Sequence, residues 1–250
     1  MTRNLDAYSN EYLRQPFEPV MIRYRRKKTV EWLGDTRQLS ILEIGCGISP
    51  AFDWIQHWRW LSLLEPATEF ASRIHEQMQH HPSVDLITAT LESNPAFPHA
   101  PFDIILLNSL LHELQDPASA LKSLHHWAHP QTRIFINVPN ALSVHRRLAV
   151  HMGLIPSPDT LSDFNHLFQQ ARVFTPATLQ SLAEQCGYRI LRQETAFIKP
   201  FTHAQMQTWM DAGILTDTLL EGLYRVSPEM PDAGAEIFME LQPIANPGSQ

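Results

Sequence analysis

The chain has 250 residues, of which 44% are hydrophobic and 18% charged, and its formal net charge is −7. This length allows one domain with a large core, and the excess of acidic residues weighs against a nucleic-acid partner. No apolar run reaches the roughly 18 residues of a membrane helix, and the first residues lack a signal-peptide core. We therefore expect a cytoplasmic protein without membrane contact.

Residues 8–34 have a helical apolar spacing, which predicts one or two N-terminal helices that end at Gly34. The basic run Arg23–Lys28 lies within this segment. Because the apolar positions keep a helical period, most of these charges are predicted to lie on a solvated face. A site for an anionic substrate or RNA is the alternative.

Five short apolar runs predict buried strands, and helical patterns separate several of them. The expected strands are 40–44, 60–65, 84–88, 102–108 and 132–138, and the expected helices are 50–57, 67–79 and 117–128. Alternation of this kind predicts βαβ units in a parallel sheet with right-handed crossovers.

Beyond the fifth strand the chain departs from simple alternation. We expect a helix over 141–153, an irregular segment over 154–174, a helix over 176–185, a strand over 188–198, two helices within 203–224 and an antiparallel last strand over 235–241. Residues 1–250 then form a single domain, with a helical cap (1–36), a core (37–140), two insertions (141–174 and 199–234) and the last strand (235–242).

Both insertions leave the sheet at its carboxyl edge, where open α/β folds bind ligands. We expect them to form a helical lid that excludes water and selects the substrate. The side chains that could line a small cavity under this lid are Leu142, Met152, Leu154, Phe164, Phe168, Phe201, Met206, Trp209 and Met210, with His145, Arg147, His166 and His203 as polar groups.

A glycine turn follows the first predicted strand, in the run Ile41–Gly47. Gly45 and Gly47 have no Cβ, so the backbone can adopt positive φ and approach a ligand closely. Glu65 ends the next apolar run, about 20 residues further on, where a nucleotide fold places its acceptor for ribose hydroxyls. No third glycine follows, which argues against NAD and favours an adenosyl ligand without phosphates.

Cysteine and histidine usage does not indicate a metal site. The two cysteines are Cys46, within the glycine turn, and Cys186, so neither a disulfide framework nor a cysteine-based zinc site is expected. The 13 histidines are scattered, and the closest sets lack a carboxylate partner. We predict no bound metal.

Four motifs together resemble the class I S-adenosylmethionine-dependent methyltransferases. They are Leu-Glu-Ile-Gly-Cys-Gly (42–47), Leu-Leu-Glu-Pro (63–66), Phe-Asp-Ile-Ile-Leu-Leu-Asn (102–108) and Leu-His-Glu-Leu-Gln-Asp-Pro (111–117). The segment 138–147 is similar to a bacterial small-molecule subgroup. The resemblance implies a Rossmann-like α/β fold, with a seven-stranded mostly parallel sheet, helices on both faces and an antiparallel last strand.

The resemblance also implies S-adenosyl-L-methionine as cofactor. The implied cofactor-binding residues are Glu43, Gly45, Cys46, Gly47, Glu65, Pro66, Leu91, Glu92, Asn108 and Ser109. Glu43 would accept a hydrogen bond near the cofactor's amino group, unless it bonds to a neighbouring backbone group. Glu65 would bind the ribose hydroxyls, and Asn108 the amino-acid end. For Glu92, the alternative interpretation is a solvated carboxylate on a loop.

His112, His145 and His166 are the candidate catalytic residues, because an imidazole titrates near neutral pH and can act as a base. Many relatives have Glu-His where this chain has His112-Glu113, and a partly buried structural histidine is the alternative for His112. Arg147 could clamp a carboxylate or phosphate, whereas Tyr8 and Tyr12 could close over the cofactor.

Methyl transfer from a sulfonium is an in-line displacement, which requires positioning more than acid–base groups. The sequence therefore predicts a methyltransferase acting on O or N of a small metabolite. A non-catalytic S-adenosylmethionine-binding module and an NAD-dependent oxidoreductase are the alternatives, and the oligomeric state, monomer or homodimer, stays open. RNA and DNA-adenine methylation are disfavoured, because Asn108 is followed by Ser-Leu-Leu.

Overall fold

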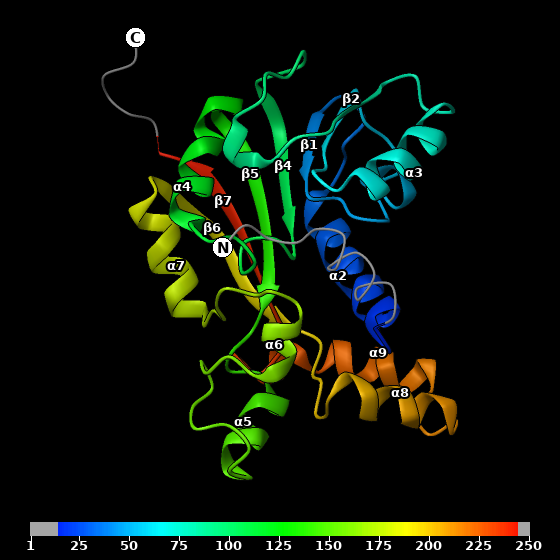
Figure 1. The fold of residues 1–250 in the computed structure, drawn as a ribbon, viewed down its shortest axis with the longest axis vertical. Coiled ribbons are helices and arrows are strands. Elements are labelled where there is room, and N and C mark those ends of the chain that lie inside the picture. Colours follow the sequence, from blue (N-terminus) through cyan, green and yellow to red (C-terminus); the bar gives the residue numbers. More distant parts are fainter. Residues whose placement is uncertain (1–14, 245–250) are drawn as a thin grey trace.

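The computed structural model describes residues 15–244, which fold around one seven-stranded sheet (Figure 1). The strand order is β3-β2-β1-β4-β5-β7-β6. The strands are β1 (Ser40–Ile44), β2 (Trp60–Leu64), β3 (Val84–Ile87), β4 (Phe102–Asn108), β5 (Ala128–Pro139), β6 (Tyr188–Ala196) and β7 (Glu236–Pro243). The first five strands pair in parallel, and β7 runs antiparallel to both β5 and β6. The predicted fold class is confirmed.

Eight helices within the described residues lie on both faces of the sheet and beyond the carboxyl ends of its strands. They are α2 (Glu18–Leu33), α3 (Thr68–Met78), α4 (Pro117–Ser123), α5 (Val144–His151), α6 (Asp163–Leu167), α7 (Pro176–Gln185), α8 (His203–Asp211) and α9 (Asp217–Arg225). One apolar cluster joins the sheet to α2, α3, α8 and α9, and a second joins the other face to α4 and α7. No helix within residues 15–244 is long and apolar enough to cross a membrane.

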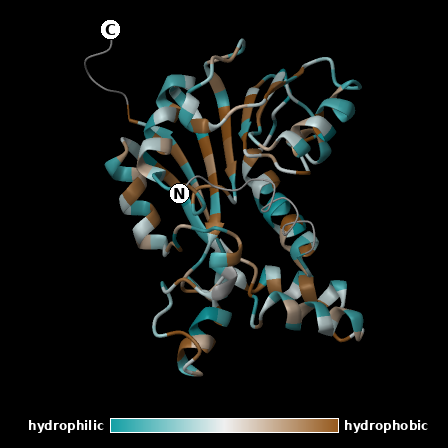
Figure 2. Cartoon of the chain, in the orientation of Figure 1, coloured by the Kyte–Doolittle hydropathy of each residue, from teal (hydrophilic) through white to brown (hydrophobic). Residues whose placement is uncertain are grey.

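The two clusters follow from the period of two residues along each strand. In β4, Ile104 and Leu106 belong to the first cluster, whereas Ile105 and Leu107 belong to the second. Since both faces of a parallel sheet are covered, its strands are apolar at consecutive positions. Figure 2 accordingly shows the strands mainly in hydrophobic colours.

Two predicted helices differ from the structure. The segment 50–57 has only a short 3-10 turn, Ala51–Asp53. The reason is that the chain is already extended at Arg59, whose amide donates to the carbonyl of Leu39 ahead of β2. The predicted helix 117–128 ends at Ser123 and tightens into the 3-10 turn Leu124–Trp127. The predicted irregular segment 154–174 contains the short helix α6.

The elements beyond the carboxyl ends of the strands position the site. In Figure 1, β4 and β5 point toward α5 and α6, and α8 and α9 lie at the same end of the molecule. The helices of both predicted insertions therefore lie at the carboxyl edge of the sheet, as expected.

Candidate functional site

The turn after β1 has the backbone that its two glycines permit. Gly45 and Gly47 have φ angles of 72° and 58°, which side chains with a Cβ rarely adopt. The amide of Gly45 bonds to the carbonyl of Leu64 over 2.8 Å, so the turn is attached to the end of β2. A Cβ on Gly45 would lie 3.3 Å from the methyl carbons of Leu110.

Two buried carboxylates hold this turn. Oε1 of Glu65 accepts a hydrogen bond from the amide of Ala67, at 2.9 Å, and its Oε2 accepts one from the amide of Gly47, at 2.8 Å. Glu43 accepts a 2.7 Å hydrogen bond from the amide of Ala51, as the backbone alternative for this residue predicted. Burial raises the pKa of Glu43 to about 8, although the hydrogen bond from Ala51 and the charge of Arg26 oppose this.

A cavity of about 390 Å³ lies against the turn. One part is lined by Gly45–Ser49, Glu65–Ala67 and Asn108–Leu110, at the ends of β1, β2 and β4. The other part is lined by side chains of α2, of α5 and of the segments before α8 and β7. The cavity thus joins the glycine turn to segments that are far apart in the sequence.

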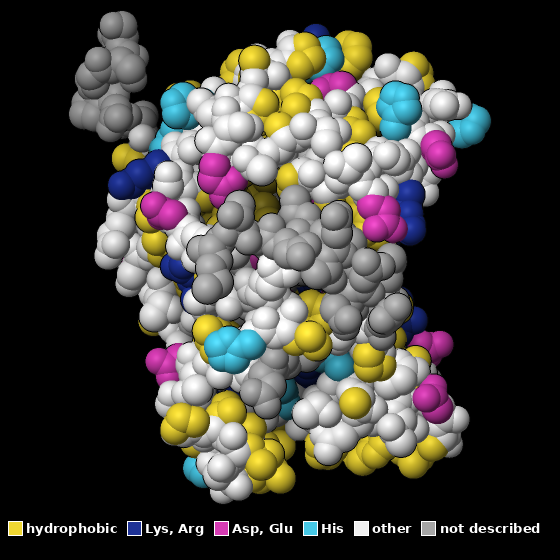
Figure 3. Space-filling model, in the orientation of Figure 1, with side chains coloured by type: hydrophobic (Ala, Val, Ile, Leu, Met, Phe, Trp, Pro, Cys, Tyr) yellow, Lys and Arg dark blue, Asp and Glu magenta, His cyan; other side chains and the backbone are white. Residues whose placement is uncertain are grey.

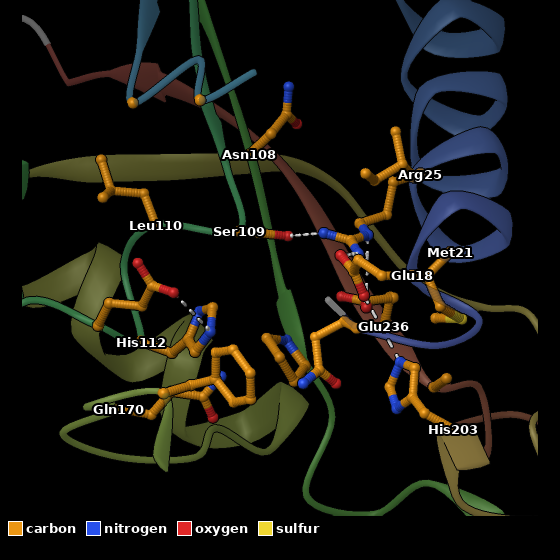
Figure 4. Close-up of a pocket in the computed structure, with 18 of the residues that line it drawn as sticks. Glu18, Met21, Arg25, Asn108, Ser109, Leu110, His112, Gln170, His203 and Glu236 are labelled. Carbon is orange, nitrogen blue, oxygen red and sulfur yellow. Dashed lines mark hydrogen bonds and ion pairs between the residues drawn. The ribbon is translucent and has the colours of Figure 1, made fainter. Parts of the chain in front are cut away.

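A cluster of charged side chains, Glu18, Arg25 and Glu236, lines one side of this cavity (Figure 4). Arg25 of α2 forms an ion pair with Glu18, and its Nε lies 3.7 Å from Oε1 of Glu236. Its guanidinium also donates to Oγ of Ser109. Asn137 donates to Oε2 of Glu236 over 2.8 Å. Burial would raise the pKa of Glu18, but Arg25 and a histidine lower it to about 2.

A second group borders the first, on the segment that follows β6. Nζ of Lys199 lies 3.2 Å from Nδ1 of His203, and Nε2 of His203 lies 3.5 Å from Oε2 of Glu18. Burial and the charge of Lys199 lower the pKa of His203 to about 4, so this imidazole is neutral. His145 of α5 also lines the cavity, and burial together with Lys199 holds its pKa well below the usual value.

The structure brings most of the predicted site residues to the cavity. The predicted residues that line it are Glu43, Gly45, Cys46, Gly47, Glu65, Pro66, Asn108, Ser109, His112 and His145. His112 is buried, with its Nε2 3.9 Å from Oε1 of Glu113.

Four predicted site residues lie outside the cavity lining, within the described part of the chain. Leu91 is buried in the apolar cluster on the α4 side of the sheet, and Glu92, Arg147 and His166 are exposed. On α5 the neighbouring Arg146 faces inward instead of Arg147. Tyr8 and Tyr12 fall outside the described residues.

The apolar lid prediction is only partly met. Phe168 lines the cavity. Met152 and Leu154, by contrast, are 69% and 68% exposed, and Met206 is fully buried in the core against α2. Figure 3 shows hydrophobic side chains gathered on the outer surface at the end of the molecule where α5 lies.

Sequence reasoning missed Glu18, Arg25, Lys199 and Glu236 as lining residues. The interpretation of the basic run as solvated is wrong for Arg25 and Lys28, whose side chains are 11% and 12% exposed. A signal was present, because Arg25 lies four residues from the buried residues Met21 and Thr29, on the same stripe of the helix. Lys199 and Glu236 carried no comparable signal.

The comparisons with known proteins agree with this geometry. Residues 15–193 match a family model described as a methyltransferase domain. No curated protein matches the chain in sequence.

Three solved structures illustrate the similarity in fold. An S-adenosylmethionine-dependent methyltransferase from Mesorhizobium loti is 15% identical, with a TM-score of 0.60 over 86% of this chain and 96% of that chain. A 1,6-didemethyltoxoflavin-N1-methyltransferase from Burkholderia thailandensis is 15% identical, with a TM-score of 0.55 over 88% and 77%. The [4+2]-cyclase SpnF is 12% identical, with a TM-score of 0.59 over 88% and 80%.

Proposed function

The chain belongs to the methyltransferase-domain family, and we propose that it transfers a methyl group from S-adenosylmethionine to an oxygen or nitrogen atom of a small metabolite. The observation that carries the proposal is one cavity that joins the glycine turn and Glu65 to polar side chains of α2, α5 and β7. The first part suits the cofactor of this family, and the second suits an acceptor.

The residues of the turn fit an adenosyl group. No described atom lies within 4 Å of a Cβ built on Gly47, so this side of the turn is open to a ligand. Both oxygens of Glu65 accept backbone hydrogen bonds in the turn, and Oε2 also lies 4.0 Å from Sγ of Cys46. Glu65 also lines the cavity beside the turn, where a carboxylate is suited to accept from ribose hydroxyls. When bound, the cofactor supplies a methyl carbon made electrophilic by the attached sulfonium.

The protein's own part is to orient the acceptor and to exclude water. The cavity is small and its walls include buried side chains from segments on several sides, which favours a metabolite over a polymer in an open basic groove. The insertions that carry α5, α6 and α8 supply part of these walls, in agreement with the proposed lid. His112 and His145 are the two candidate catalytic histidines that line the cavity.

A fold of this kind does not by itself establish methyl transfer, since a similar structure is named as a [4+2]-cyclase. The test must therefore separate binding from reaction. Calorimetry should give tight binding of S-adenosylhomocysteine. It should give no binding of NAD, because the turn lacks the third glycine that a dinucleotide fold uses to approach the pyrophosphate. Labelled S-adenosylmethionine, supplied at a concentration that only the wild type saturates, should then donate its methyl group to a component of a fractionated small-molecule extract, with the weakly binding Glu65→Ala as the control.

Binding of S-adenosylhomocysteine without transfer to any fraction would favour the non-catalytic alternative. Preference for NAD would contradict the cofactor assignment.

A further inference from the structure

Lys199 has a buried amino group whose hydrogen-bonding capacity is mostly unused in the part of the chain that the structure describes. Its side chain lines the cavity, and the residue is 4% exposed. Nδ1 of His203, at 3.2 Å, is the single hydrogen-bond partner of Nζ in this part of the chain. An ammonium can donate three hydrogen bonds, and burying one with donors unpaired is costly. The position therefore suits a ligand that supplies an oxygen acceptor.

The charges around Lys199 do not satisfy it fully. Glu18 and Glu236 face it from α2 and β7, but Arg25 already interacts with both carboxylates. Arg25 and Arg146 add positive charge nearby. Burial lowers the pKa of Lys199 to about 8, in spite of Glu236 and Glu18. The amine can thus hold or release a proton close to neutral pH.

His145 supplies a complementary acceptor on the same wall of the cavity. Its Nδ1 is buried without a hydrogen-bond partner among the described residues, and burial together with the charge of Lys199 holds the pKa of the ring well below its usual value. A neutral imidazole has one donor and one acceptor nitrogen. With no other partner for Nδ1 among the described residues, this nitrogen can accept a hydrogen bond from a hydroxyl group of a ligand in one tautomer of the neutral ring.

We propose that Lys199 binds the methyl acceptor, with His145 beside it, and that this acceptor carries a weakly acidic hydroxyl group of the phenol type. This inference rests on the proposed function and narrows its acceptor atom to oxygen. The O–H bond of the acceptor breaks with its electron pair left on oxygen, and the proton bonds to the lone pair of the neutral Nζ. The resulting ammonium then donates hydrogen bonds to the oxyanion. A preformed carboxylate would need no such proton transfer.

The test uses 4-nitrophenol, whose anion absorbs visible light, and the protein saturated with S-adenosylhomocysteine. We expect the bound phenol to ionise at lower pH than the free phenol, as seen by its absorbance. Lys199→Met should abolish this shift and weaken binding about 10- to 100-fold, the worth of hydrogen bonds to a charged group.

Lys28→Met is the matched control. Lys28 is also well covered, at 12% side-chain exposure, but it pairs with Glu194 away from the cavity, so this variant should bind 4-nitrophenol like the wild type. Unchanged binding in Lys199→Met overturns the proposal. So does tighter binding of 4-nitrobenzoate than of 4-nitrophenol by the wild type, which would indicate a preformed anion.

Two further outcomes keep the result clear. If Lys199→Met does not fold, the wild-type titration decides, and an unshifted ionisation of bound 4-nitrophenol overturns the proposal. Calorimetry with S-adenosylhomocysteine is the separate measure of the cofactor half. If the wild type does not bind S-adenosylhomocysteine, the proposed function is contradicted. If it binds S-adenosylhomocysteine normally but the ionisation of bound 4-nitrophenol is not shifted, only the acceptor assignment is contradicted.

Discussion

The backbone amide of Gly47 donates a 2.8 Å hydrogen bond to Oε2 of Glu65. This contact joins the turn after β1 to the end of β2, so the carboxylate predicted to bind the cofactor also shapes the loop that would surround it. Cofactor affinity and loop conformation should therefore change together when Glu65 is altered.

Replacing Glu65 with alanine removes the carboxylate and both of its backbone hydrogen bonds. We expect S-adenosylhomocysteine to bind more weakly by about 1.5–3 kcal/mol, the range for hydrogen bonds to a charged group. Calorimetry measures this, and Glu69→Ala on the exposed side of α3 is the control. An unchanged affinity in a folded variant would remove Glu65 from the site.

Gly45 and Gly47 provide a matched pair of substitutions to alanine. Both residues have positive φ, which should cost about 1–2 kcal/mol of stability in either variant. Only at Gly45 does the new Cβ meet Leu110, at 3.3 Å. Gly45→Ala should therefore lower the thermal midpoint more than Gly47→Ala. Equal losses would mean that Leu110 moves aside without cost.

Glu43 predicts a dependence of stability on pH. Its pKa is raised from 4.5 to about 8, so in this window the folded protein holds a proton that the unfolded chain has lost. The resulting stabilisation is fully present below pH 4.5 and is lost as the pH rises through 8. Glu43→Gln cannot ionise, so relative to the wild type its free energy of unfolding should increase over this range.

Thermal or urea unfolding of the cofactor-free protein at both ends of the window checks this expectation. The exposed Glu76→Gln on α3 is the control and should show a constant difference from the wild type. A constant difference for Glu43→Gln as well would contradict the shifted pKa.

Arg146 and Arg147 are neighbours on α5 with opposite expected roles in stability. Arg146 donates to the carbonyl of Pro158 at 2.8 Å, to that of Thr160, and to Oδ1 of Asn165 at 3.3 Å. Arg146→Ala should therefore destabilise the protein by about 1–3 kcal/mol, because it leaves these acceptors unpaired. Residues 158–165 should also be cleaved faster by protease.

Arg147 is exposed, so Arg147→Ala should stay within about 0.5 kcal/mol of the wild type. Equal protease sensitivity of the two variants would show that Arg146 does not hold this segment.

The sequence alone was enough to predict the sheet, the glycine turn and the position of Glu65. Buried parallel strands are apolar at consecutive positions, and a turn with positive φ requires glycine, so both leave a local pattern. The prediction of a helix over 50–57 was wrong. The local spacing of apolar residues there is helical, but the chain must already be extended at Arg59, where it pairs with Leu39 ahead of β2. Such long-range pairing leaves no mark on a short window of sequence.

The acceptor half of the cavity was decided only by the tertiary structure. Arg25, Lys199 and Glu236 come from three distant segments, and neither Lys199 nor Glu236 has a local pattern that distinguishes it from a surface charge. On α5, successive side chains point in different directions, so the exact start of the helix places Arg146 inside and Arg147 outside. Local patterns specify which residues form strands and turns, whereas the packing of helices against the sheet determines which charged side chains are buried together.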